Sequence, residues 1–350
     1  ADQIAVNIES LGGNVSVIGG NNSLSLNSEF LSNDFNQAFN IVSDVIMDPT
    51  FPQSAVNREK ETLLLDIEEE RESPLSLAAI VARENIFGNH PHRYSRLGTV
   101  DVIKESDTEK LLKFYSEYGV SNNGVITLCG AIDSNKVINK IEDCLSNIKT
   151  GEAMNTIFDD PQWPLKQKEV EIKHHKEQAV VMIAFPGLDI NSDERATISV
   201  IEEIAGGMDG LLFTRIREEL GLAYYVGMSQ MVGYSSGSIL FYAGTNSESV
   251  LKVQNELNLI IGSLIKEKIG EDVLTRAKNA LIGKYALSKQ SLSARSQSMA
   301  LNLLYGLGER YDDENIEKIK RLTPEDLQKC CQKYFDTASK VTVQVIPNNK

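Results

Sequence analysis

The chain has 350 residues, of which 41% are hydrophobic and 24% charged, a composition typical of a globular protein of about two domains. The formal net charge of −14 argues against a nucleic-acid surface, which needs a basic stripe to neutralise phosphates. No apolar run approaches the roughly 18 residues of a membrane span.

The first part of the chain alternates helical and strand patterns. A long acidic helix is interrupted at Pro74, and a second helix follows. Gly124 to Gly130 predicts a buried strand. Helices are predicted over about 4–11, 34–48, 55–72, 74–88, 107–118 and 134–148, and strands over about 15–17, 24–30 and 124–130.

The stretch 151–169 lacks periodicity and predicts a linker between a first domain, 1–150, and a second domain, 170–350. In the second domain, Leu212, Ile216 and Leu220 share one face of a helix that closes on Gly221 and leads into a strand. The other helices are predicted over about 192–204, 250–266, 271–288, 293–305 and 323–334, and the strands over about 180–185, 224–227, 238–243 and 341–346.

The two halves repeat. Arg58 to Gly88 and Arg276 to Gly306 both span 30 positions, and both predict a long helix, a break, a second helix and an aromatic–glycine pair. These matches predict two tandem copies of one α+β unit. In the second copy, a strand and a helix over about 170–207 precede the position that corresponds to residue 1 of the first copy. We therefore expect the first domain to be truncated at its N-terminus.

Several motifs together resemble the pitrilysin/insulinase family of zinc metallopeptidases, which includes the mitochondrial processing peptidases. The specific part follows Gly206-Gly207 and reads Leu212-Phe213-x-x-Ile216-Arg217-Glu218-x-x-Gly221-Leu222-Ala223-Tyr224. Weaker matches are Ile8-Glu9-x-Leu11-Gly12-Gly13, Pro49-x-Phe51 leading to Arg58-Glu59, and Phe87-Gly88-x-His90-Pro91.

This resemblance implies an α+β fold of two similar domains, each a mainly antiparallel sheet with helices packed on it, facing each other across a substrate chamber. It implies that Arg217 and Tyr224 bind the substrate backbone or stabilise the oxyanion, a task that suits a guanidinium and a phenol. It further implies that Asp66 occupies the position of the third zinc ligand, where the family has glutamate. Glu59, seven residues earlier, matches the family's upstream glutamate.

The inverted zincin motif of active relatives, His-x-x-Glu-His, is absent from the chain. His174 and Gln178 bracket the nearest segment, which leads into a strand, so a pair of ligands on one helical face is excluded there. His90 and His92 flank a proline and are expected to serve loop packing or helix-end hydrogen bonding. Zinc is thus expected for the intact family enzyme and not for this chain.

Two classes of function follow from the resemblance. The first is a zinc metalloendopeptidase or close homologue seen without its His-x-x-Glu-His helix, and hence inactive as it stands. The alternative is a non-catalytic subunit of a two-chain peptidase, or a peptide-binding scaffold with a dead site. The partners expected are a peptide or unfolded protein substrate, together with a second copy or a zinc-bearing subunit. A soluble cytoplasmic or periplasmic location is expected.

Overall fold

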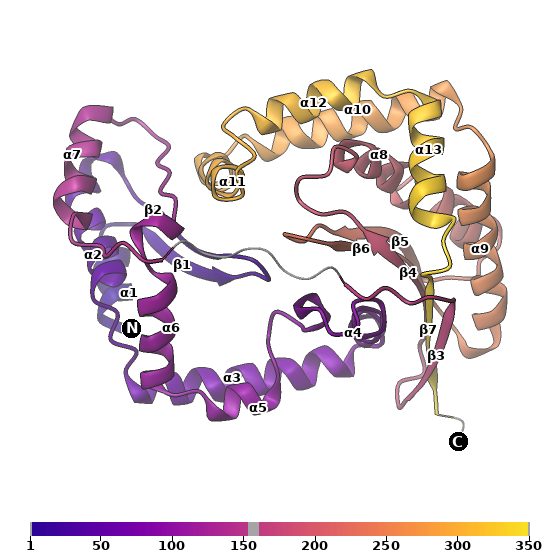
Figure 1. Ribbon diagram of the computed structural model, residues 1–350, viewed down its shortest axis with the longest axis horizontal. Coiled ribbons are helices and arrows are strands. Elements are labelled where there is room, and N and C mark those ends of the chain that lie inside the picture. Colours follow the sequence, from indigo (N-terminus) through magenta and orange to yellow (C-terminus); the bar gives the residue numbers. More distant parts are fainter. Residues whose placement is uncertain (1, 153–160, 349–350) are drawn as a thin grey trace. The chain divides into compact units, whose positions relative to one another are not determined.

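The computed structural model of the chain describes residues 2–152 and 161–348 and contains a two-stranded and a five-stranded sheet among many helices (Figure 1). Contacts between Cα atoms divide the chain into two compact units. Unit 1 comprises residues 1–65, 98–156 and 286–309, and unit 2 comprises 66–97, 157–285 and 310–350. Each unit mixes helix and sheet, which confirms the predicted α+β class.

Unit 1 is built around the hairpin of β1 and β2, which pair antiparallel. Helix α1 packs on β1 and α11 on β2, while α2 packs on α1 and on α7. Ile8 and Phe39 are buried in its core, and the hydroxyl of Tyr115 on α6 donates a 2.7 Å hydrogen bond to the carbonyl of Ile46. Its elements are α1 (Asp2–Glu9), β1 (Asn14–Gly19), β2 (Leu24–Glu29), α2 (Phe35–Met47), α5 (Val100–Glu105), α6 (Thr108–Tyr118), α7 (Ser134–Leu145) and α11 (Leu292–Leu304), with the first part of α3 (Gln53–Glu72).

The strand predicted over Gly124 to Gly130 is wrong. This segment has no strand pairing among the described residues, and Val125 and Ile126 are exposed rather than buried. Its counterpart in the second half is β7 (Val341–Pro347), which lies between β3 and β4. The described residues of the first half contain no counterpart of β3 and β4, so the apolar pattern has no sheet to join.

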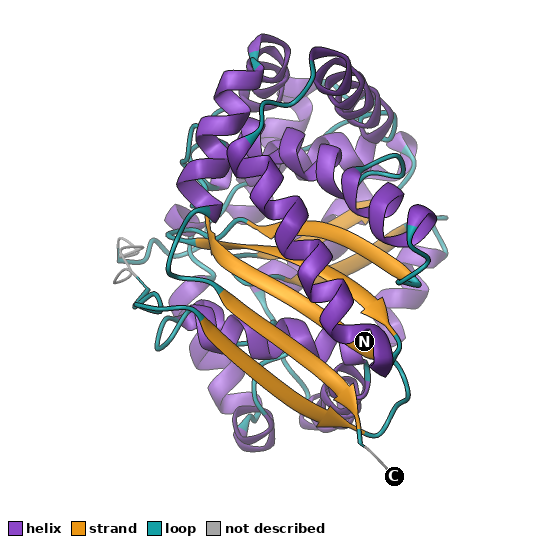
Figure 2. Ribbon diagram, turned by 90° about the vertical axis from the view of Figure 1, so that its right-hand side faces the viewer, coloured by secondary structure: helices purple, strands orange, loops and turns teal. Residues whose placement is uncertain are grey.

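Unit 2 contains a five-stranded sheet (Figure 2). Its strand order is β3-β7-β4-β6-β5, and β3 and β7 are the one parallel pair in this sheet. Helices α8, α9 and α13 pack on this sheet, as does α4. Its elements are α4 (Pro74–Ile86), β3 (Lys168–His174), β4 (Ala179–Gly187), α8 (Arg195–Gly206), β5 (Tyr225–Met231), β6 (Gly237–Thr245), α9 (Val250–Lys266), α10 (Glu271–Ser288), α12 (Tyr311–Arg321), α13 (Pro324–Phe335) and β7.

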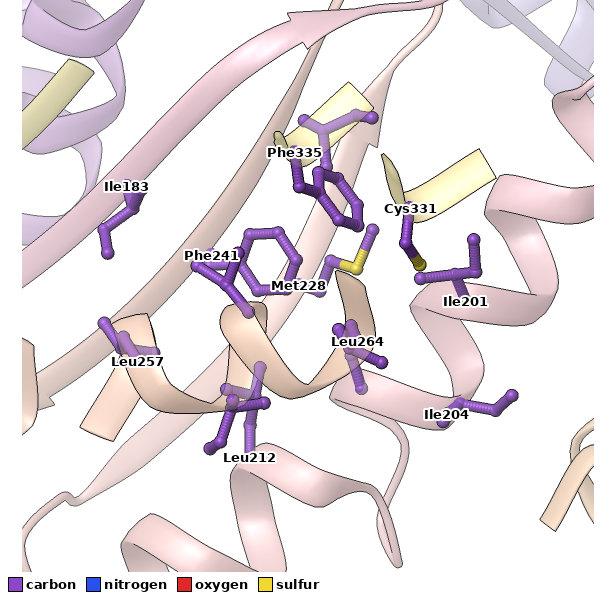
Figure 3. Close-up of a cluster of buried hydrophobic side chains, with 14 of the residues drawn as sticks. Ile183, Ile201, Ile204, Leu212, Met228, Phe241, Leu257, Leu264, Cys331 and Phe335 are labelled. Carbon is purple, nitrogen blue, oxygen red and sulfur yellow. The ribbon is translucent and has the colours of Figure 1, made fainter. Parts of the chain in front are cut away.

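The central strand β4 is buried on both faces, which explains its continuous apolar sequence from Ala179 to Phe185. Because successive side chains of a strand point to opposite faces, β4 contributes to two cores. Ile183 and its odd-numbered neighbours join the core with α8, α9 and α13 (Figure 3), and Met182 and its even-numbered neighbours join the core with α4. Phe241 lies fully buried in the first core, with its ring centroid 5.2 Å from that of Phe335.

The repeat is visible in the helices. Shifting the bounds of α4 by 218 residues gives 292–304, the bounds of α11, and the same shift carries Gly88 onto Gly306. Both glycines have positive φ, 57° and 72°. The repeated helix does not stay with its own half, since α4 packs on β4 and β7 in unit 2 and α11 packs on β2 in unit 1.

The compact units therefore cut the chain differently from the predicted boundaries 1–150 and 170–350, which describe the repeat. Of the predicted linker 151–169, residues 153–160 lie outside the described residues, and 161–167 form no helix or strand. The sequence missed α12 and the separate strand β3. In the described ranges, no helix is both long enough and apolar enough to cross a membrane.

Candidate functional site

The turn between α8 and β5 contains a π-helix, η4 (Phe213–Glu219), where the sequence predicted an ordinary helix. The N–H of Leu220 donates to the carbonyl of Arg215 at 3.3 Å, a bond that spans five residues instead of four. A π-helix has about one residue more per turn than an α-helix, and short π-helices occur frequently at functional sites. The predicted helix is therefore confirmed in place and corrected in geometry.

The extra residue changes which side chains are buried. Leu212 and Ile216 are fully buried, as predicted, but Leu220 is 37% exposed because the wider turn rotates it off their face. The helix closes on Gly221, whose φ is 61°, and the N–H of Leu222 reaches back to the carbonyl of Ile216 at 2.9 Å. A glycine in the left-handed conformation, followed by an N–H that bonds back to a helix carbonyl, is the expected C-terminal cap of a helix. Here that hydrogen bond spans one residue more than in an ordinary α-helical cap.

Arg217 lies on this π-helix with an exposed side chain. Its guanidinium carbon stands 4.9 Å from the centroid of the Phe213 ring, and within the described residues it has no ion pair. Arg215 differs, since it binds Glu219 at 2.8 Å and Glu256 at 3.0 Å. The fold thus uses Arg215 for local ion pairs and leaves the charge of Arg217 available.

Tyr224 follows the turn, directly before β5. Its backbone N–H donates to the carbonyl of Gly244 at 2.8 Å, which fixes the backbone against β6, while its side chain is 61% exposed. The next residue, Tyr225, is half-buried against the sheet, and its ring centroid lies 6.5 Å from that of Tyr242. Burial raises the pKa of Tyr225. The phenol of Tyr224 makes no hydrogen bond to any described residue, so it is free to donate to a ligand.

Glu59 and Asp66 both lie on α3 with exposed side chains. Seven residues make about two helical turns, so the two carboxylates share a face of α3. Glu59 lies 3.9 Å from Arg58. The described residues supply no pair of further ligands beside Asp66, because their single group of three possible metal ligands consists of Glu72, His174 and His175. The side chains present therefore do not fit a catalytic zinc at Asp66.

His90 and His92 are buried in unit 2, which confirms loop packing. His90 Nδ1 accepts the N–H of His92 at 3.2 Å, and His90 Nε2 lies 3.2 Å from the hydroxyl of Ser235. Burial, together with the neighbouring His90 and Arg83, lowers the pKa of His92 to about 4. A Cβ on Gly233 would come within 2.4 Å of His92 Nε2, so only glycine fits there. His92 is a neutral packing residue at neutral pH.

Two family models match the chain. The model described as "Insulinase (Peptidase family M16)" matches residues 1–99, and the model described as "Peptidase M16 inactive domain" matches residues 107–281. The second match contains both Arg217 and Tyr224.

Similar curated proteins bear two kinds of name. A protein of Rickettsia felis named "Uncharacterized zinc protease" is 26% identical, over 100% of this chain and 84% of its own length. The "Uncharacterized zinc protease YmxG" of Bacillus subtilis is 23% identical, over 92% and 80%. The "Non-peptidase homolog YmxG" of Helicobacter pylori is 22% identical, over 93% and 76%.

Solved structures share the fold. A peptidase M16 inactive domain from Pseudomonas fluorescens superposes with a TM-score of 0.88 at 20% identity, covering 99% of this chain and 84% of that one. A protease from Helicobacter pylori gives a TM-score of 0.84 at 15% identity, covering 99% and 85%.

Proposed function

The chain belongs to the insulinase family, peptidase family M16, and from that premise we propose that it binds extended peptides for hydrolysis by a zinc peptidase. In this proposal Arg217 and Tyr224 bind the peptide. The proposal rests on two exposed groups, the guanidinium of Arg217 on the π-helix and the phenol of Tyr224, whose backbone the sheet holds. Among the described residues the guanidinium has no ion pair and stands over the Phe213 ring, and the phenol makes no hydrogen bond.

The chemistry of the pair suits a peptide backbone. The guanidinium of Arg217 carries several N–H donors and a permanent charge, and the hydroxyl of Tyr224 adds one more donor. Both can donate to a peptide carbonyl, and both bonds strengthen when that oxygen gains negative charge during attack on the peptide bond. Gly221 and the bond from Tyr224 to Gly244 hold the two residues on a rigid turn, which lowers the entropy lost on binding.

Zinc would supply the activated water in such an enzyme. His-x-x-Glu-His is absent from these 350 residues, and among the described residues the side chains around Asp66 do not complete a ligand set. In this proposal, a partner chain or sequence outside these 350 residues supplies the histidines. The relatives named as zinc proteases are longer than this chain, which covers 84% and 80% of two of them.

Binding of a fluorescent extended peptide, followed by anisotropy, tests the proposal on the 350-residue chain. A hydrogen bond to a charged group contributes about 1.5 to 3 kcal/mol, so Arg217→Ala should weaken binding about 10- to 100-fold. Tyr224→Phe removes a neutral bond of about 1 kcal/mol and should weaken it about fivefold. The neighbouring changes Arg215→Ala and Tyr225→Phe are matched controls, and we expect them to leave the affinity nearly unchanged.

Two outcomes would count against the proposal. If the wild-type chain bound no extended peptide, the pair would have no ligand of this class. If Arg217→Ala and Arg215→Ala weakened binding equally, a general loss of positive charge would explain both, and Arg217 would have no special role.

A further inference from the structure

Two histidines and a glutamate from distant parts of the sequence meet in unit 2. One ring nitrogen of His174, one of His175 and a carboxylate oxygen of Glu72 all lie within 4.8 Å of one another. His175 Nε2 is 2.9 Å from Glu72 Oε2, and the two imidazole rings lie 4.4 Å apart at an interplanar angle of 33°. We propose that Glu72, His174 and His175 form a binding site for a divalent transition-metal ion, zinc above all.

The fold explains why two consecutive histidines act together here. Successive side chains along a strand point to opposite faces of the sheet, so two neighbours within β3 could not share a ligand. His174 is the last residue of β3, aligned with Pro347 of β7, and its carbonyl accepts the N–H of Asn348 at 2.7 Å. His175 already belongs to the turn toward β4, and the chain bends there. Its ring can therefore lie beside that of His174.

The three proposed ligands differ in how far their side chains are exposed to solvent. His174 is only 7% exposed, so packing orients its ring. The side chains of His175 and Glu72 are 58% and 54% exposed, which leaves solvent access for an incoming ion. Glu72 is the last residue of α3, so a bound ion would tie the end of this helix to the turn between β3 and β4.

The donor set selects the class of metal. Two imidazole nitrogens and one carboxylate oxygen suit zinc, nickel and copper, whereas magnesium and calcium prefer oxygen donors only. Three protein ligands leave at least one coordination position for water. The site shares no residue with the proposed peptide site of Arg217 and Tyr224, and it does not include Asp66.

Metal binding has one visible cost. His174 Nδ1 accepts the backbone N–H of Lys176 at 3.2 Å. Ligation through Nδ1 uses the lone pair that accepts this bond, and ligation through Nε2 moves the ring proton to Nδ1, so His174 gives up the bond in either mode. The bond is long, and Lys176 is exposed, so water can take its place on the amide. Without metal, the contact between His175 and Glu72 is an exposed polar contact of the kind that contributes little to stability.

The test is a zinc titration of the untagged, chelator-treated 350-residue chain by isothermal calorimetry, with zinc alone as the probe. We expect one zinc ion per chain. Glu72→Gln and His175→Gln should each weaken binding about tenfold or more. Both side chains are more than half exposed, so these variants should fold. Glu68→Gln, on the same helix, and His92→Asn, a histidine outside the site, are the matched controls and should bind as the wild type does.

A second measurement keeps the test independent of any one variant. Cobalt in place of zinc should give a visible absorption band in the wild type, and this band should disappear in the double variant His174→Gln/His175→Gln. Absence of zinc binding by the wild type would overturn the proposal. Equal affinity in the wild type and this double variant would also overturn it.

Discussion

Lowering the pH should destabilise unit 2 through His92. Burial beside His90 and Arg83 lowers the pKa of His92 from 6.5 to about 4, so between these values the unfolded chain binds a proton that the folded chain does not. Stability therefore is fully present above the unfolded pKa and falls as the pH drops toward the folded pKa. From about pH 7 to about pH 4.5 the shift corresponds to about 2.4 kcal/mol without screening. Solvation of the protonated ring as the loop relaxes around it reduces our expectation to about 1.5 kcal/mol.

The assay is urea unfolding at both pH values for the wild type and for His92→Asn, which cannot titrate. Since other groups titrate in both proteins, the informative quantity is the difference between their pH dependences, in which a constant cost of the substitution cancels. We expect the wild type to lose about 1.5 kcal/mol more than the variant. In chelator-treated protein, His175→Gln, whose side chain is exposed, should behave as the wild type does. Equal pH dependences for the wild type and His92→Asn would refute the reasoning.

Three further predictions concern stability, each measured by urea unfolding. Gly221→Ala should lower the free energy of unfolding by about 1 kcal/mol, because φ of Gly221 is 61°, although the space around an added Cβ is open. Gly262→Ala inside α9 should raise the free energy of unfolding by up to about 1 kcal/mol. Equal effects of the two substitutions would contradict the role of φ. Phe241→Ala should cost about 3 to 5 kcal/mol, because it empties the fully buried core position against Phe185 and Phe335, and a cost below about 1 kcal/mol would show that the core collapses around it. Thr323→Ala should cost about 1 kcal/mol, because Thr323 and Asp326 form the capping box of α13; no loss would mean that the cap is dispensable.

Much of the fold could be predicted because local patterns encode it. The helices α9 and α10 have the predicted bounds, since their apolar residues recur at helical spacing and clear breaks flank them. The positive φ of Gly221 followed from its place after a helical stripe. The repeat showed in advance that α4 and α11 correspond, because both copies keep the same order of helix, break and glycine.

Other features depend on contacts that no local pattern contains. The segment 124–130 is apolar enough for a strand, yet a strand forms only beside a partner, and none is present in the described residues. Helix α12 is mostly charged, and its apolar stripe is short, so its periodicity was too weak to detect. Helix α4 belongs to unit 2 and α11 to unit 1, and the sequence repeat does not determine on which unit each of these helices packs.

The resemblance pointed to the residues of the candidate site but not to its geometry. Arg217 and Tyr224 were found from the resemblance, but the π-helix that carries Arg217 was not, since one extra residue in a turn leaves the sequence pattern unchanged. The pairing of Glu72 with His175 joins a helix end to a strand end, so sequence spacing could not reveal it. The argument against His174 as half of a helical zinc motif still holds, because His174 lies at the end of a strand.

The affinity of an extended peptide for Arg217→Ala compared with Arg215→Ala most directly tests the central claim. The two arginines are two residues apart on the same π-helix and carry the same charge, but among the described residues only Arg215 is bound by carboxylates. We predict that Arg217→Ala weakens binding about 10- to 100-fold, whereas Arg215→Ala changes it by no more than about threefold. Equal losses, or a larger loss for Arg215→Ala, would contradict the assignment of Arg217 to the peptide.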